Sequence, residues 1–179
     1  MRLRCCFFLP IIAFCAPALA QQAFPDDWLG QWWGTLAVER GRDTLMTTRM
    51  QLGIARADAA SYTWSLSYGP TGADDRPYRL ERVDSAGTHW RIDERNGIVL
   101  DAYLHGGVLY SCFSVMGSRL YTRDELRGDT LYHEIVSGPV AGLPTGDTVL
   151  AATADTIPPV DSHRLPNRQS ARLVRAKSP

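Results

Sequence analysis

The chain has 179 residues, a length typical of one domain, with 19 basic and 19 acidic side chains. This charge balance excludes a general nucleic-acid binder, which needs a basic surplus to neutralise phosphates. Hydrophobic residues make up 45% of the chain and include five Trp and seven Tyr, so we expect a folded core rather than a disordered chain.

Residues 1–20 have the features of a secretory signal peptide. Two early arginines precede an apolar run over residues 5–15, and residues 18–20 are Ala-Leu-Ala, the small-x-small pattern that signal peptidase cleaves. The apolar run is shorter than the roughly 20 residues that span a bilayer. We therefore expect cleavage after Ala20, a periplasmic or secreted protein, and no membrane span in the mature chain.

The mature chain is expected to have no internal disulfide. Three of the four cysteines lie in the predicted signal peptide, which leaves Cys112 alone. Cys112 stands between Ser111 and Phe113, and we predict a small buried apolar residue there rather than a nucleophile. The stability of the fold must then come from its core.

Period-two alternation runs through most of the mature chain. Residues 46–54 place Met, Thr, Met, Leu and Ile at the even positions, and residues 62–68 place Tyr, Trp, Leu and Tyr in the same way. Such alternation, rich in aromatic residues and Thr, predicts half-buried strands. The other expected strands, separated by turns rich in Gly, Asn and Asp, are residues 28–39, 77–83, 88–94, 98–104, 108–115, 119–126 and 130–137.

These nine strands predict an all-β fold in which residues 21–137 form an antiparallel meander. No window shows the apolar spacing of an amphipathic helix. A sheet this long must close on itself or fold over to remove its exposed edges. We expect a single up-and-down β-barrel of about eight to ten strands, with a sandwich as the alternative.

The last 42 residues of the chain differ in composition from the rest. Residues 138–161 are rich in Ala, Thr, Pro and Gly, which indicates a long connection. In residues 162–179, arginines alternate with apolar residues, which favours a strand with one solvated face that closes the barrel, followed by a basic tail. The alternative is a wholly disordered tail.

Gly30-Gln31-Trp32 begins the first strand soon after the predicted signal peptide. A Gly-x-Trp at this place, followed by an antiparallel meander, resembles the lipocalins and the wider calycin group of β-barrels. The resemblance implies that Trp32 closes one end of the barrel under an arginine of the last strand. The candidates are Arg164, Arg168, Arg172 and Arg175, of which we choose Arg172. The Thr-Asp-Tyr-type motif of lipocalins is not found, so the resemblance supports a lipocalin-like barrel more than membership of that family.

If the even positions of the early strands face inward, aromatic and Met side chains line the barrel. Such walls suit a small apolar or aromatic ligand, with hydroxyl and indole groups orienting it. The alternative is that the same side chains fill a packed core. The expected ligand-binding residues are Met46, Met50, Tyr62, Trp64, Tyr68 and Trp90.

Two carboxylates are the candidates for catalysis. A two-residue turn at Asn96-Gly97 would make Glu94 and Asp101 diagonal neighbours on one face of a hairpin. Two carboxylates in an apolar wall raise one pKa, as acid–base catalysis requires. A slipped register would instead turn them to solvent.

The histidines show no short metal-ligand spacing, and in Tyr132-His133-Glu134 the His and Glu fall on opposite faces of a strand. The sequence contains no Gly-x-Ser-x-Gly elbow, phosphate loop or Cys-x-x-Cys. We therefore expect no metal and no cofactor, and a binding protein rather than an enzyme.

The expected function is that of a periplasmic or secreted protein that binds a small apolar or aromatic ligand inside the barrel. Two alternatives remain open. One is an envelope protein–protein interaction module with a packed interior, and the other is a small hydrolase or isomerase built on Glu94 and Asp101.

Overall fold

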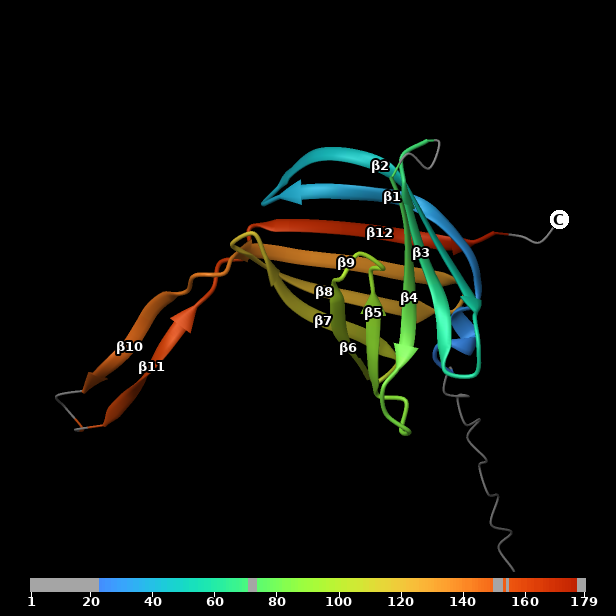
Figure 1. The fold of residues 1–179 in the computed structure, drawn as a ribbon. Coiled ribbons are helices and arrows are strands. Elements are labelled where there is room, and N and C mark those ends of the chain that lie inside the picture. Colours follow the sequence, from blue (N-terminus) through green and yellow to red (C-terminus); the bar gives the residue numbers. More distant parts are fainter. Residues whose placement is uncertain (1–22, 71–73, 150–152, 154, 177–179) are drawn as a thin grey trace, which may run out of the picture.

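The computed structural model describes residues 23–70, 74–149, 153 and 155–176, so the predicted signal peptide lies outside the described residues. Ten strands form one closed antiparallel barrel, which confirms the predicted fold class (Figure 1). The barrel strands are β1 (Gly30–Arg40), β2 (Asp43–Arg56), β3 (Ser61–Tyr68), β4 (Asp74–Arg82), β5 (His89–Asp93), β6 (Val99–His105), β7 (Val108–Val115), β8 (Ser118–Arg127), β9 (Thr130–Pro139) and β12 (Asn167–Arg175).

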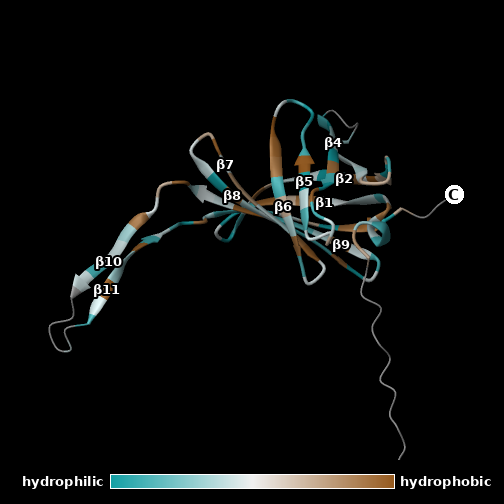
Figure 2. Ribbon diagram, turned by 60° about the horizontal axis from the view of Figure 1, so that its bottom comes forward, coloured by the Kyte–Doolittle hydropathy of each residue, from teal (hydrophilic) through white to brown (hydrophobic). Residues whose placement is uncertain are grey.

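Each barrel strand from β1 to β9 pairs with the next, and β12 then pairs with both β9 and β1. Closure by β12 leaves the barrel without free edges. The strands alternate between hydrophobic and hydrophilic residues along their length, because one face points into the barrel and the other into solvent (Figure 2). None of the described residues belongs to a helix long and apolar enough to cross a membrane.

A separate two-stranded arm stands between β9 and β12 in the sequence. Its strands are β10 (Leu143–Val149) and β11 (Thr156–Ser162), which pair antiparallel in a sheet of their own. The arm projects away from the barrel (Figure 1). The connection expected over residues 138–161 therefore contains a hairpin, and residues 162–179 contain the strand that closes the barrel.

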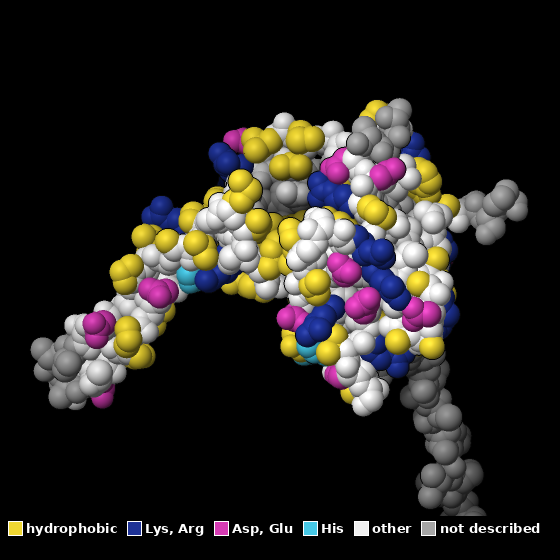
Figure 3. Space-filling view, viewed as in Figure 1, with side chains coloured by type: hydrophobic (Ala, Val, Ile, Leu, Met, Phe, Trp, Pro, Cys, Tyr) yellow, Lys and Arg dark blue, Asp and Glu magenta, His cyan; other side chains and the backbone are white. Residues whose placement is uncertain are grey.

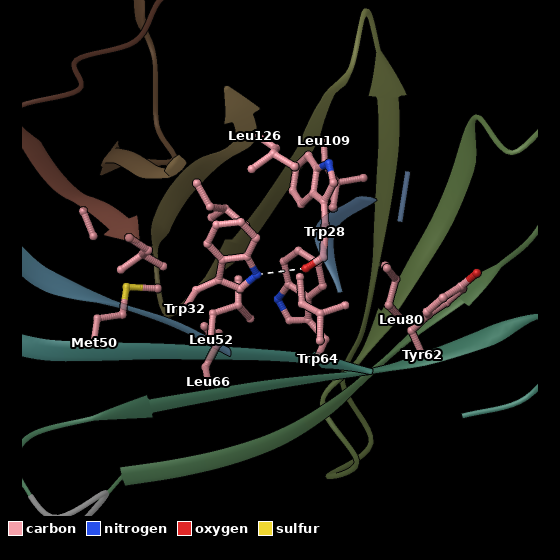
Figure 4. Close-up of a cluster of buried hydrophobic side chains, with 14 of the residues drawn as sticks. Trp28, Trp32, Met50, Leu52, Tyr62, Trp64, Leu66, Leu80, Leu109 and Leu126 are labelled. Atoms are coloured by element: carbon pink, nitrogen blue, oxygen red, sulfur yellow. Dashed lines mark hydrogen bonds between the residues drawn. The ribbon is translucent and has the colours of Figure 1, made fainter. Parts of the chain in front are cut away.

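Aromatic side chains fill one end of the barrel, which we call the closed end. A short 3₁₀ helix, η1 (Asp26–Trp28), precedes β1 and inserts Trp28 there. Trp28 and Trp32 are each at most 1% exposed, and the indole Nε1 of Trp32 donates a hydrogen bond of 2.8 Å to the carbonyl of Trp28 (Figure 4). Phe24 packs edge-on against both Trp28 and Trp90. The remaining buried core includes Leu52, Ile54, Tyr62, Leu80, Leu109, Leu126, Leu131 and Leu173.

The prediction of a buried Cys112 was wrong. Leu109 and Ser111 of β7 are buried and face the interior, so the alternation of the strand turns Cys112 outward. Its thiol is free and its side chain is exposed.

Candidate ligand-binding site

The end of the barrel opposite η1 encloses a cavity of about 660 Å³, which we call the outer cavity. All ten barrel strands or their adjoining turns contribute to its wall. In an up-and-down barrel, every strand either starts or finishes at a given end, so all ten reach this one. Figure 3 shows a hollow bordered by hydrophobic side chains below β1 and β2. Its lining residues are mostly apolar: Leu36, Val38, Met46, Tyr68, Tyr78, Ile98, Leu100, Phe113, Val115, Leu120 and Ile135, with polar Thr48, Asp74, Arg76, Glu94, Ser114 and Gln169.

A smaller space of about 110 Å³, the inner chamber, continues from the outer cavity toward the packed core. The two spaces share lining residues from five strands, among them Tyr68, Leu100 and Phe113. The wall that belongs to the inner chamber alone is formed by Trp64, Leu66, Ile92, Ser111, Thr122, Asp124 and His133. The floor of the cavity therefore combines apolar side chains with four polar ones.

Asp124 and His133 form a buried pair in this floor. They are direct partners in the register of β8 and β9, and their side chains are 7% and 8% exposed. The ring Nδ1 of His133 donates to Oδ1 of Asp124 at 2.7 Å. The other ring nitrogen, Nε2, is buried and has no hydrogen-bond partner among the described residues. Buried polar atoms are nearly always paired, so this nitrogen marks a place where a bound group would be stabilised.

A charged pair lies in the wall of the outer cavity. Arg76 Nε and Nη2 donate to the two carboxylate oxygens of Asp74 at 3.0 and 2.6 Å, a bidentate geometry. This hydrogen bonding raises the pKa of Arg76 and lowers that of Asp74. The guanidinium carbon of Arg76 also lies 5.0 Å from the centre of the Tyr68 ring.

Tyr68 itself is largely buried, and burial raises the pKa of its phenol to about 12. Burial also raises the pKa of the neighbouring Tyr78. Both phenols therefore stay neutral at physiological pH, and both side chains line the cavity. Among the described residues, no three His, Cys, Asp or Glu side chains are grouped so that they could hold a metal ion.

The six predicted ligand-binding residues divide between core and cavity. Met50, Tyr62 and Trp90 belong to the packed core and line neither space. Trp64 is a core residue that also borders the inner chamber. Tyr68 and Met46 line the outer cavity, and Met46 is 54% exposed at its mouth.

Glu94 and Asp101 do not share a face, so the predicted carboxylate pair was wrong. The backbone N–H of Glu94 donates to the carbonyl of Ile98 at 2.9 Å, which makes a three-residue turn and shifts the register by one residue. Glu94 then faces the cavity, whereas Asp101 lies on the outer surface within 2.8 Å of His89 Nε2. The hydrogen bond from His89 lowers the pKa of Asp101, which is the opposite of what an acid catalyst needs.

The arginine that packs over Trp32 is Arg175, and the choice of Arg172 was wrong. The guanidinium carbon of Arg175 lies 4.2 Å from the centre of the Trp32 ring, and these residues are direct partners in the β1–β12 register. Arg172 has the opposite parity on β12 and lies on the outer face, over Tyr132. Gly30 has a φ of +128°, and a Cβ there would lie 3.2 Å from Nη1 of Arg175, so this position requires glycine.

Asp124 was not among the predicted site residues, although the sequence contains a signal for it. Leu120, Thr122, Asp124 and Leu126 occupy the even positions of one expected strand. A two-residue turn at Gly128-Asp129 places Asp124 directly opposite His133, which is the observed register. An acidic residue on an apolar strand face, opposite a histidine, is the pattern that would have indicated the pair.

No protein-family model matches the chain, and no curated protein matches it significantly. Its fold is similar to the crystal structure of a DUF3598-family protein of unknown function from Nostoc punctiforme, with 14% identity and a TM-score of 0.55. The match covers 84% of this chain and 48% of that one, so the chain spans about half the length of that protein. The fluorescent protein UnaG matches with 13% identity and a TM-score of 0.46, over 84% of this chain and 98% of UnaG. The likeness to the DUF3598 protein concerns the fold alone.

Proposed function

We propose that the protein is a periplasmic or secreted, lipocalin-like binding protein that holds a small, largely apolar ligand in the outer cavity and the inner chamber. The observation that carries this proposal is the cavity itself. Its volume of about 660 Å³ falls within the ~300–1,000 Å³ typical of small-molecule sites. The closed end supplies a packed core of its own, so the barrel can fold without a ligand.

A probe-binding experiment on the mature protein tests this proposal. N-phenyl-1-naphthylamine is expected to gain fluorescence in the presence of the protein, with saturation at one probe per chain. Leu100 faces the cavity, whereas its neighbour Val99 is 53% exposed on the outer surface. Leu100→Trp should fill the cavity and abolish probe binding, and Val99→Trp should leave binding unchanged. Failure of the parent protein to bind, or equal loss in both variants, would refute the proposal.

The location proposed for the protein rests on the predicted signal peptide. The test is expression of the full chain in a Gram-negative host, followed by cell fractionation and mass measurement. We expect the protein in the periplasmic fraction or the medium, with Gln21 as its first residue. Retention of residues 1–20 in a cytoplasmic product would contradict this.

The β10–β11 arm favours a second candidate function, the binding of an envelope protein. The arm stands off the barrel, and Leu143 and Val160 on it are about half exposed. Leu143 and Ser162 are paired partners, so a short Gly-Ser link can replace the whole arm without moving the ends of β9 and β12. Quantitative comparison of cross-linked periplasmic proteins with and without the arm tests this function; identical profiles would exclude it.

A further inference from the structure

The inner chamber contains a polar pair with one unused hydrogen-bonding position. We infer that Asp124 and His133 are the element that recognises the ligand's polar group, and that they select a neutral ligand carrying a hydroxyl at its inner end, an alcohol or a phenol. This inference rests on the proposed function and adds the chemical class of the ligand.

The unpaired Nε2 of His133 is the first observation behind this inference. Asp124 holds the imidazole in place through Nδ1, so the ring cannot turn to pair Nε2 elsewhere without losing that bond. Leaving a buried nitrogen unpaired is unfavourable, and an oxygen placed beside it removes the penalty. The gain is available only to a ligand that reaches the floor of the chamber with a hydrogen-bonding group.

A hydroxyl matches Nε2 in either protonation state of the imidazole. With Nδ1–H donated to Asp124, a neutral ring presents an Nε2 lone pair, which accepts a hydrogen bond. A protonated ring presents Nε2–H, which donates one. A hydroxyl can donate in the first case and accept in the second, whereas a carbonyl or a carboxylate can only accept.

The charges around the chamber disfavour an anionic ligand. Asp124 and Glu94 both line it, and each would repel a carboxylate. The cation in the same wall, Arg76, already forms a bidentate pair with Asp74. Among the other groups of the floor, the hydroxyl of Ser111 donates to the backbone carbonyl of Asp101 at 2.7 Å. Thr122 adds one further hydroxyl to this floor, and His133 is the residue of the floor with a buried nitrogen that lacks a hydrogen-bond partner among the described residues.

The test compares three probes that share one apolar ring system: 1-naphthol, naphthalene and 1-naphthoate. Affinities are measured by displacement of N-phenyl-1-naphthylamine from the mature protein. We expect 1-naphthol to bind at least about tenfold more tightly than naphthalene, and 1-naphthoate to bind more weakly than 1-naphthol. Equal affinities for 1-naphthol and naphthalene, or a preference for 1-naphthoate, would overturn the inference and leave the proposed function intact. Absence of binding by all probes would instead remove the proposed function.

A double variant tests whether Asp124 and His133 are responsible for the preference for 1-naphthol over naphthalene. His133→Phe/Asp124→Leu removes both polar partners together, so that neither is left buried alone. We expect naphthalene affinity within about threefold of the parent and a 1-naphthol to naphthalene ratio close to one. Glu134→Gln, on the outward face beside His133, is the control that should keep the full preference. A double variant that still prefers 1-naphthol would overturn the assignment.

A spectroscopic measurement keeps the inference testable if the double variant fails to fold. In ¹⁵N-histidine-labelled protein, 1-naphthol should shift the Nε2 resonance of His133, whereas naphthalene should leave it nearly unchanged. Movement of the resonance by both probes alike would show that the imidazole responds to cavity filling and not to the hydroxyl.

Discussion

Arg175 and Trp32 lie face to face across the seam where the last barrel strand meets the first, with 4.2 Å between the guanidinium carbon and the centre of the indole ring. Arg175 also donates through Nη2 to the carbonyl of Asp27 at 2.8 Å and through Nη1 to the carbonyl of Leu29. One side chain thus joins β12, β1 and the η1 segment at the closed end.

Loss of this side chain should loosen that end of the barrel. Arg175→Ala removes a cation–π contact and two charge-assisted hydrogen bonds, so we expect the free energy of unfolding to fall by about 1–3 kcal/mol. Urea denaturation followed by Trp fluorescence measures this. Arg172→Ala, on the outer face of the same strand, is the matched control and should lose less than about 1 kcal/mol. Equal losses would contradict the role given to Arg175.

Two glycines of the barrel should respond differently to the same substitution. A Cβ at Gly34 would collide with the backbone carbonyl oxygen of Arg172 and lie 2.8 Å from Cδ2 of Leu173. Gly34→Ala must therefore push β12 away from β1, and we expect a loss of about 1–3 kcal/mol or more. A Cβ at Gly53 would meet only the flexible side chain of Gln31, so Gly53→Ala should change stability by less than about 1 kcal/mol. Thermal unfolding compares the stabilities of the two variants. A Gly34→Ala protein as stable as the parent would show that β12 can move away from β1 without loss of stability.

Trp64 should prove to be important for stability as well as for the shape of the inner chamber. It is 3% exposed and its ring lies 6.3 Å from that of Trp28. Trp64→Leu should lower the free energy of unfolding by about 2–5 kcal/mol and enlarge the inner chamber, so N-phenyl-1-naphthylamine should still bind. Trp33→Leu, at a half-buried position under Arg49, should lose less. Abolished probe binding in a well-folded Trp64→Leu protein would mean that the indole itself forms the binding surface.

The buried phenol of Tyr68 predicts a loss of stability at alkaline pH. Its pKa is about 12 in the folded protein and close to 10 in an unfolded chain, so the folded state retains the proton longer. The resulting stabilisation is complete below pH 10 and is lost as the pH rises toward 12. The phenylalanine in Tyr68→Phe cannot ionise. Between pH 9 and pH 11 the free energy of unfolding of this variant should therefore fall by about 1 kcal/mol less than that of the parent. Urea denaturation at pH 9 and pH 11 tests this. Tyr121→Phe, on the outer surface, is the control, and its free energy of unfolding should change with pH as that of the parent does.

The barrel could be predicted from sequence because its signals are local. Alternation of apolar and polar residues defines each strand, and turn residues separate the strands. The faces of β6 could not be predicted in this way. The turn before this strand has three residues, with Arg95 at a φ of 62° and Gly97 at 97°, and an arginine gives no sequence signal for a positive φ. The resulting one-residue slip turned Asp101 outward and Leu100 inward.

The alternation of residues along the strands also could not predict which part of the interior is packed core and which part is cavity. Even-numbered aromatic residues were correctly expected to be inside, but the pattern does not distinguish the two ends of a barrel. The difference arises from Trp28, which lies on η1 before the first strand and fills one end. A segment that belongs to no strand therefore decides which inward residues line the cavity and which pack against one another.

Because aromatic side chains fill one end of the barrel, the cavity formed by the described residues lies at the other end, where Met46 and Val115 stand at its mouth. A molecule bound as proposed passes Met46 and Val115 before it reaches His133, so its hydroxyl must lead on the way in and trail on the way out. A ligand longer than the outer cavity and the inner chamber together would leave its apolar tail outside the mouth of the cavity. The β10–β11 arm leaves the barrel at this same end, since β9 finishes and β12 starts there. A protein bound to the arm would thus stand next to the mouth of the cavity and meet the tail first.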